Sequence, residues 1–443
     1  MSGSIRLGNQ PLTPDSGMFG FGLLVVTALY LTISTLTLLK LGFNYEESGG
    51  NVFEKIHPAT LIAAVILAAA LLARGNPLRS LHDIVNQNPC TAIFVAMIGL
   101  MIGYSIEIVR LPFTGFIDTF IAPVIVFYLF KGISETRARH LVWLIHALLL
   151  LNAIIGIGEF VTGDRLTPLI ANGVVISDDW RSTALLGHPL ANASLTGAYL
   201  LAMAIGGGDD LPKPIAALCF IVNSAAMVVF GGRASTVILL ALLACLALLS
   251  AIRILRGARF DKTTVLIGLL LVPIVSLVVL TLAEAGFFAQ FLERFVDDKG
   301  SASTRIAMFE LFHYLSWYQL LFVPDADQLA TLKRIFGLDF GIESFWVSFV
   351  LDYGLIPSLA FFAALFLFCW DLLRAARRGT IWVLIFFFLV ASTSVSLSAK
   401  STIFAVLVLF IMTLLRLPQA DPVSRVTRRG HYVALAELHG RPA

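Results

Sequence analysis

The sequence FGFGLLVVTALYLTISTLTLL, from Phe19 to Leu39, contains no charged side chain over 21 residues. About 20 apolar residues in an α-helix are enough to cross the hydrocarbon core of a bilayer. Residues 1–17 contain one basic residue, Arg6, and lack the basic region and small-residue cleavage site of a secretory signal peptide. We therefore expect Phe19–Leu39 to belong to a retained membrane-spanning helix.

Similar apolar segments recur along all 443 residues, of which 58% are hydrophobic and only 13% charged, with a mean hydropathy of +0.89. Soluble domains carry roughly a quarter charged residues, so this chain has too few polar side chains to cover a water-soluble globule of its size. We expect an all-α, polytopic integral membrane protein that forms a single domain over residues 1–443. The net charge of +3 does not indicate nucleic-acid binding, and the four cysteines lack the spacing of a zinc site.

The apolar segments predict about 12 transmembrane helices, of which the second, fourth and twelfth are short. The predicted helices are Phe19–Leu41, Thr60–Ala73, Thr91–Val109, Ile117–Phe130, Leu141–Val161, Ala191–Gly206, Ile215–Phe230, Ser235–Ser250, Val265–Ala283, Phe345–Trp370, Ile381–Leu397 and Ile403–Leu415.

The connections between these helices differ in basic charge, which marks the cytoplasmic side of a membrane. One alternate set contains 13 basic residues, and the other, without its longest loop, contains seven. We expect the first set and both termini to be cytoplasmic, in a bacterial inner membrane. The first set is Arg74, Arg79, Lys131, Arg137, Arg139, Lys213, Arg253, Arg256, Arg259, Lys262, Arg374, Arg377 and Arg378. The second, which we call the outer basic set, is Lys40, Lys55, Arg110, Arg165, Arg181, Arg233 and Lys400.

Two predicted outer connections, 162–190 and 286–344, are too long to be simple turns, which is typical of functional loops. Within the second, a large periplasmic loop, the aromatic-rich segment Arg305–Phe322 predicts an amphipathic helix with Ser301 or Ser303 as its cap. Such a helix lies at the membrane surface or packs on neighbouring helices. Its apolar side contains Met308, Phe309, Leu311, Phe312 and Leu315, and its other side contains Glu310, His313, Tyr314 and Trp317.

Four polar clusters lie where the outer connections meet the spans. Each arginine taken alone is explained by snorkelling to lipid headgroups, Glu343 by the dipole of the next helix, and His188 by a structural role. Several arginines on the side that is poor in basic charge favour instead a ligand with phosphate groups, which arginine binds in bidentate fashion. The clusters are Trp180–Pro189 with Arg181 and His188, Gly231–Ser235 with Arg233, Ser303–Arg305, and Gly337–Trp346 with Asp339 and Glu343.

The order of these motifs resembles the superfamily of O-antigen ligases and Wzy-type polysaccharide polymerases. The resemblance spans roughly residues 180–362 and consists of Arg…GHPLANA, GGRAS between two spans, STR in the long outer loop, and GLDFGIESFWVSFVLDYGLIP after it. The family shows an Arg…G…HP segment, an SRG-like arginine, a loop arginine and a GxGxHNxxLxxLxxxGxxG segment. The resemblance implies a GT-C-like helical membrane fold and a lipid-diphosphate-linked glycan as substrate.

The resemblance also implies roles for particular residues. Arg233 and Arg305 match the arginines thought to hold the diphosphate, and Arg181 and His188 match the segment at the mouth of the sixth span. The chain departs from the family at Glu343, where ligases carry a histidine regarded as catalytic. A carboxylate also serves as a general base, so Glu343 with Arg305 is the predicted catalytic pair. His313 and Asp339 stay open as alternative bases and are counted among the predicted binding residues.

The implied reaction is attack of an acceptor hydroxyl on an anomeric carbon, with undecaprenyl diphosphate as the leaving group. Arginines can stabilise the leaving diphosphate, so we expect no metal and no cofactor. We expect a polymerase of exopolysaccharide or O-antigen repeat units that works beside a flippase and a chain-length regulator. The alternatives are an O-antigen ligase, disfavoured by Glu343, and a transporter or flippase. A transporter is disfavoured because its halves would repeat and its spans would carry ionisable residues. Here no convincing repeat is seen and such residues are scarce, with Glu107 and Asp352 in or near spans without an obvious partner.

Overall fold

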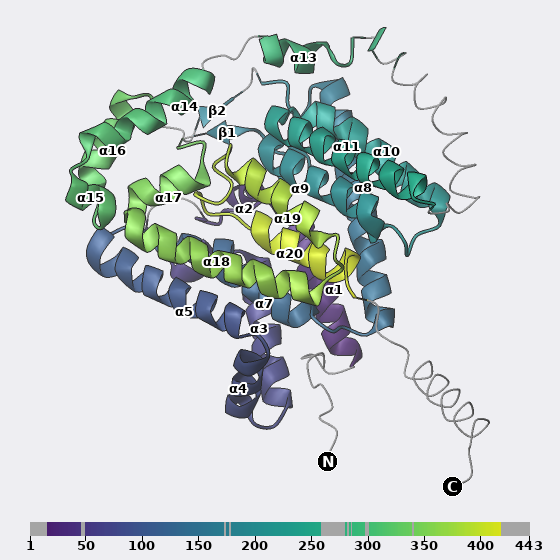
Figure 1. Cartoon of the computed structure of the whole chain (residues 1–443), viewed down its shortest axis with the longest axis horizontal. Coiled ribbons are helices and arrows are strands. Elements are labelled where there is room, and N and C mark those ends of the chain that lie inside the picture. Colours follow the sequence, from purple (N-terminus) through teal and green to yellow (C-terminus); the bar gives the residue numbers. More distant parts are fainter. Residues whose placement is uncertain are drawn as a thin grey trace.

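The computed structural model describes residues 16–45, 49–171, 174–176, 179–257, 280, 283–284, 286–296, 301–338 and 341–417. Its elements are helices, apart from a small antiparallel hairpin of β1 (Ile170–Ala171) and β2 (Val174–Val175) (Figure 1). The α-helices are α1 (Gly17–Thr32), α2 (Thr35–Lys40), α3 (Pro58–Ala73), α4 (Pro77–Gln87), α5 (Pro89–Tyr104), α6 (Thr114–Phe116), α7 (Ala122–Phe130), α8 (Glu135–Thr162), α9 (Pro189–Ala202), α10 (Lys213–Phe230), α11 (Arg233–Leu255), α13 (Ala289–Val296), α14 (Ser301–Glu310), α15 (Trp317–Leu321), α16 (Ala326–Ile335), α17 (Phe345–Tyr353), α18 (Leu355–Ala375), α19 (Thr380–Ala391) and α20 (Ile403–Leu414). Short 3₁₀ turns cover Val52–Lys55 and Leu311–Tyr314, and π-helical turns cover Ser105–Val109, Ile117–Ile121 and Met203–Gly207.

Within the described ranges, six helices are long and apolar enough to cross a membrane. A further pair, α3 and α4, passes the same test together but bends by 109° between its two parts. The protein is therefore a helical membrane protein, whereas the number of twelve spans stays a prediction. The six are Pro89–Val109, Glu135–Thr162, Pro189–Gly207, Lys213–Phe230, Arg233–Leu255 and Leu355–Ala375, and shorter apolar helices cover Gly17–Thr32, Thr114–Phe130, Thr380–Ala391 and Ile403–Leu414.

Helices occupy eleven of the twelve predicted segments, and the other, Val265–Ala283, lies almost entirely outside the described residues. Two predicted single spans are broken. Phe19–Leu41 divides into α1 and α2 at Ser34, whose hydroxyl caps the second helix. Phe345–Trp370 divides into α17 and α18 at Gly354, which has a φ of +85° that interrupts the helix.

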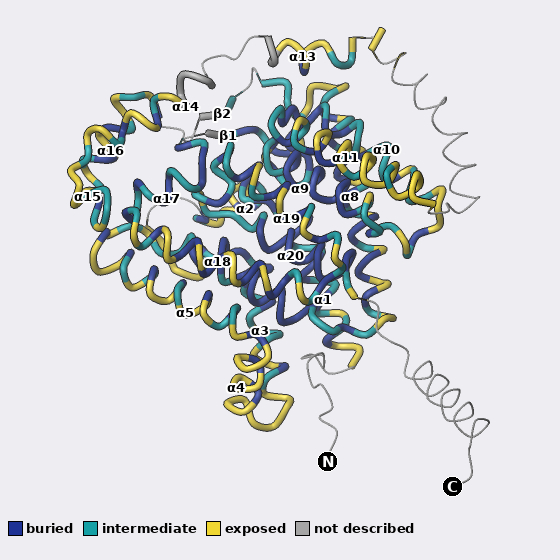
Figure 2. The backbone as a smooth tube through the Cα atoms, in the orientation of Figure 1, coloured by how far each residue is buried: buried dark blue, intermediate teal, exposed yellow. Residues whose placement is uncertain are grey.

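The core of the bundle lies around α20. All residues from Phe404 to Leu414 are buried, and α20 packs against α7, α9 and α18. In contrast, α11 leaves most of its apolar side chains exposed, and only 28% of the residues in the apolar window of Pro89–Val109, which contains α5, are buried (Figure 2). A helix that is apolar all round and exposed on one side is typical of a helix facing lipid.

The helices α14, α15 and α16 gather at one edge of the molecule, next to α17 (Figure 1). They enclose a second, smaller apolar core, whose buried members are Met308, Leu311, Leu329, Leu332, Leu338, Ile342 and Leu351. We call the region 301–338 the outer subdomain. Leu351 of α17 joins this core, so the subdomain is fixed to the bundle by the same helix that follows Glu343.

The predicted amphipathic helix Arg305–Phe322 is not a single helix. α14 ends at Glu310, and a new helix, α15, begins after Ser316, which forms a capping box with Gln319. Of the predicted apolar side, Met308 and Leu311 are buried in the small core, as the packing alternative expects, whereas Phe309 is exposed. The apolar periodicity continues across the break and does not reveal it, whereas the Ser-x-x-Gln pattern of Ser316 and Gln319 starts a new helix there.

Candidate active site

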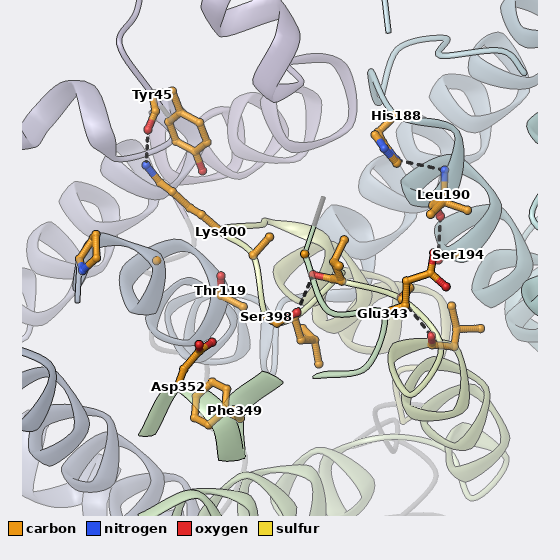
Figure 3. Close-up of a pocket in the computed structure, with 18 of the residues that line it drawn as sticks. Tyr45, Thr119, His188, Leu190, Ser194, Glu343, Phe349, Asp352, Ser398 and Lys400 are labelled. Carbon is orange, nitrogen blue, oxygen red and sulfur yellow. Dashed lines mark hydrogen bonds between the residues drawn. The ribbon is translucent and has the colours of Figure 1, made fainter. Parts of the chain in front are cut away.

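A cavity of about 1320 Å³ lies between the bundle and the outer subdomain. Figure 3 shows Tyr45 and Lys400 on one side of it and His188, Ser194 and Glu343 on the other. Among the described residues that line it, five are cationic and two are carboxylates, so the cavity favours an anionic ligand. The cationic residues are Lys55, Arg181, Arg233, Lys333 and Lys400, and the carboxylates are Glu343 and Asp352.

The predicted outer basic set converges on this cavity. Four of its seven members line the wall, although they lie far apart in the sequence. No described member of the basic set predicted to be cytoplasmic lines it. Snorkelling of independent arginines does not require such convergence, so the common cavity favours a shared ligand. The four members are Lys55, Arg181, Arg233 and Lys400.

The Arg181–His188 segment is held in place by a buried carboxylate at the end of α8. Glu159 accepts hydrogen bonds from the backbone N–H groups of Thr183 at 2.8 Å and of Ala184 at 2.9 Å. Ala184 has a φ of +42°, which is strained for a residue with a side chain, by roughly 1–2 kcal/mol. These charge-assisted hydrogen bonds offset the strain, so Glu159 fixes the backbone that carries Arg181 and His188.

Two asparagines continue this support. Asn152 of α8 accepts a hydrogen bond from Leu185 N at 3.0 Å and donates one to Asn192 at 2.9 Å. Asn192 of α9 donates to the carbonyl groups of Thr183 at 2.6 Å and of His188 at 3.1 Å. Thr183, Leu185 and His188 of the segment are thus hydrogen-bonded to side chains of two membrane helices, which holds its backbone in place.

Arg181 is clamped on two sides. Its Nε donates to both carboxylate oxygens of Asp179, at 2.8 and 2.9 Å, within a partly buried ion pair. Its methylene groups lie against the hairpin between α10 and α11, because a Cβ added at Gly231 would lie 2.8 Å from Arg181 Cδ. Gly231 also has a φ of +63°, so both its conformation and its lack of a side chain are needed here.

The same hairpin presents Arg233. Gly232 packs so closely on α9 that an added Cβ would lie 2.4 Å from the Cβ of Ala193. Arg233 is the first residue of α11, where the helix dipole already has its positive end. A cation is unfavourable for the helix at this position, but guanidinium and helix N-terminus together attract an anion.

His188 caps α9, and its Nδ1 accepts a hydrogen bond from Leu190 N at 3.2 Å. The side chain is exposed to the cavity, and the cavity walls surround it there. These surroundings, which take the ring partly out of bulk water, and the positive charge of Arg181 lower the pKa of His188 from its ordinary value near 6.5 to about 4. The ring is therefore neutral at physiological pH.

Glu343 lies in the segment before α17, is half-buried and lines the cavity. Figure 3 shows it on the same side as His188, although the two come from different elements. A carboxylate that faces a cavity can accept a proton from a hydroxyl group bound there.

Four charged residues in the wall were not assigned a role in the site by the sequence, namely Lys55, Lys333, Asp352 and Lys400. Asp352 of α17 accepts from Lys333 of α16 in an ion pair of 2.9 Å and from Ser348 at 3.1 Å. The interpretation of Asp352 as lacking a partner is therefore wrong. Its partner lies in the outer subdomain, which sequence periodicity does not place.

Lys400 is positioned by a buried network behind the wall. Its Nζ donates to Tyr45 O at 2.7 Å and lies 3.5 Å from the centre of the Tyr45 ring. The Tyr45 hydroxyl donates at 2.8 Å to Asp118, which is fully buried and also accepts from Thr60 at 2.6 Å. No motif in the sequence indicates this network.

The remaining predicted site residues are placed as follows. Arg305 lies in α14, but its side chain is outside the described part of the structure, as is the whole of Asp339. His313 is exposed in the 3₁₀ turn after α14 and is not among the described residues lining the cavity. The structure thus brings together Arg181, His188, Arg233 and Glu343.

Comparison of the chain with protein-family models, with curated proteins and with solved structures finds no match in any of the three. Within the described residues, no group of three or more His, Cys, Asp or Glu side chains is arranged to hold a metal ion. The chemistry of the cavity therefore has to be inferred from its own side chains.

Proposed function

We propose that this protein is a membrane glycosyltransferase that polymerises undecaprenyl-diphosphate-linked oligosaccharide repeat units into exopolysaccharide or O-antigen. The observation that carries the proposal is the convergence of Arg181, Arg233, His188 and Glu343 on one cavity at the end of apolar helices. A lipid diphosphate has both an anionic group for the arginines and an isoprenoid tail for the surrounding bilayer. In this proposal, the cavity faces the periplasm and both termini are cytoplasmic.

The proposed reaction needs only groups that the cavity supplies. Glu343 takes the proton of the acceptor hydroxyl as the oxygen attacks the anomeric carbon, and the bond from that carbon to the diphosphate oxygen breaks. The diphosphate leaves with the electron pair and is stabilised by Arg181 and Arg233, with Arg305 as a further predicted contributor. In neutral His188, Nδ1 already accepts from Leu190 N, so Nε2 carries the proton and can donate a hydrogen bond to a sugar hydroxyl without adding charge.

Transfer assays on the purified protein with lipid-linked repeat units test this proposal. Wild type is expected to produce a ladder of longer chains, whereas Arg233→Ala and Glu343→Gln lose activity by at least about 100-fold, which corresponds to roughly 2.7 kcal/mol. Arg253→Ala is the matched control, because Arg253 is an exposed arginine near the other end of the same helix, α11. Single transfer of a preformed chain would indicate the ligase instead, and full activity of Glu343→Gln would remove Glu343 as the base.

A further inference from the structure

The outer subdomain exposes five aromatic side chains between residues 309 and 322. Leu311 is fully buried in that core, whereas Trp317 and Tyr318 are 80% and 67% exposed. Figure 2 shows α15 in the colours of exposed and intermediate residues, and none of its residues is buried. Together with the exposed rings of Phe309, Tyr314 and Phe322, these side chains form what we call the aromatic patch. Five exposed aromatic side chains in one small region are costly to keep in water.

The patch is fixed at the level where two membrane helices end. Tyr104, in the candidate span Pro89–Val109, donates a hydrogen bond from its hydroxyl to the carbonyl oxygen of Phe322. On the other side, Gly354 at the start of α18 approaches the same carbonyl, since an added Cβ would lie 2.7 Å from it. The segment after α15 is therefore held between the ends of α5 and α18.

The surface around Tyr104 changes from apolar to charged within a few residues. Ile106 and Ile108 are exposed apolar side chains, whereas Glu107 and Arg110 are exposed and charged. Charged side chains next to lipid-facing apolar ones mark the boundary between the hydrocarbon and the headgroups. Tyr104 thus places the aromatic patch at the headgroup level.

We propose that the aromatic patch inserts into the headgroup layer of the leaflet at the cavity end of the protein. Trp and Tyr are enriched at this depth because their rings are apolar and their N–H or O–H groups remain hydrated. The continuity with the ends of α5 and α18 favours lipid as the occupant over a second protein. This inference does not depend on the proposed transferase activity.

The insertion has a consequence for the cavity. Gln319 of α15 donates to Gln328 of α16 at 2.7 Å, and Gln328 donates to Tyr314 O at 3.0 Å. α16 in turn carries Lys333, which lines the cavity and pairs with Asp352. The lipid surface therefore fixes α15, and α15 fixes one wall of the cavity at the membrane boundary.

Tryptophan fluorescence of the full-length protein in lipid nanodiscs tests the proposal. The difference between wild type and Trp317→Phe isolates the emission of Trp317 from that of the other tryptophans. We expect strong quenching of this difference by phosphatidylcholine brominated close to the headgroup, weaker quenching by lipid brominated near the chain ends, and little quenching by aqueous acrylamide. Trp180→Phe provides the matched control, since Trp180 lines a polar pocket with Asp179 and Glu159.

Two results would overturn the proposal. Quenching of Trp317 by acrylamide but not by brominated lipid would show that the patch faces water. Protection from both quenchers would show that a protein surface, such as a second copy of the chain, covers it. Transfer activity is not part of the measurement, so the proposal about the patch and the proposed function fail independently.

Discussion

Arg181 lies across Gly231, so that a Cβ added to this glycine would be 2.8 Å from both Cγ and Cδ of the arginine. The two residues come from different connections, one before α9 and one after α10. The contact therefore couples the position of Arg181 to the hairpin that presents Arg233. The side chain of Arg181 and the backbone of the hairpin are held together before any ligand binds, which lowers the free-energy cost of organising this part of the site around a diphosphate.

We expect Gly231→Ala to reduce transfer by at least about 10-fold, although no charge is removed. The added methyl group displaces Arg181, and the left-handed conformation costs roughly 1–2 kcal/mol. Rates at saturating and limiting lipid-linked substrate measure the effect. Gly257→Ala is the control, because Gly257 also has a positive φ, of +92°, but has open space around an added Cβ. Equal loss in both variants would show that backbone strain alone is responsible.

Glu159→Gln is expected to lower both stability and activity. The amide keeps the shape of the side chain, but it presents a single acceptor oxygen to the N–H groups of Thr183, Ala184 and Leu166. Hydrogen bonds to charged groups contribute about 1.5–3 kcal/mol each, so the Arg181–His188 segment becomes less well fixed. Glu159 has a positioning role if the substrate affinity falls by more than the loss of melting temperature can explain. Loss of stability with unchanged affinity would contradict it.

The Lys333–Asp352 ion pair should show coupling in a double-mutant cycle. Its side chains are 26% and 20% exposed, so solvent screens the pair and we expect a coupling of about 1 kcal/mol. Lys333→Ala and Asp352→Ala are compared with the double variant by thermal unfolding in detergent. The swapped pair, Lys333→Asp with Asp352→Lys, should recover part of the stability. Strict additivity of the two single variants would rule out the interaction.

The lowered pKa of His188 predicts a pH dependence of stability. The unfolded chain binds a proton at this residue below about pH 6.5, whereas the folded chain binds it only near pH 4. The stability contribution is therefore fully present above pH 6.5 and is lost as the pH falls toward 4. His188→Gln should make the fall in melting temperature over this window smaller. His313→Gln is the control, because His313 is exposed away from the cavity, and an equal effect of both variants would refute the assignment.

The orientation of the protein can be tested with cysteine variants at exposed positions. We expect Glu107→Cys to react with a membrane-impermeant maleimide from the periplasm of intact cells, and Arg253→Cys only after the inner membrane is broken. Both positions are exposed, and each lies at the end of a helix, on opposite sides of the membrane in the predicted topology. The reverse pattern would place the cavity in the cytoplasm and remove the basis for a periplasmic polymerase.

The helices could be predicted from the sequence because apolar runs of the required length are a local signal, and α8 and α11 lie where the hydropathy placed them. The candidate site was predicted in part. Arg181, Arg233 and Glu343 stood out as charges at span ends on the side poor in basic residues, and all three line the cavity.

The contacts that could not be predicted from the sequence join residues that lie far apart in the chain. Lys400 contacts Tyr45 across 355 positions, and Glu159 supports a segment more than 20 residues later. Neither relation follows a helical or strand period, so periodicity carries no information on it. The breaks within helices could not be predicted for a related reason. The hydropathy of a segment does not reveal the backbone angle of a glycine such as Gly354, where one helix ends and the next begins.

The central place of α20 has a consequence for the biogenesis of the protein. α20 is the last helix of the described chain, yet α7, α9 and α18, which surround it, leave the ribosome earlier. The final packing of α7, α9 and α18 around residues 403–414 can therefore be completed only after α20 has been synthesised. The contact between Lys400 and Tyr45 likewise joins the two ends of the bundle, so the cavity and the proposed activity depend on the part of the chain that is made late.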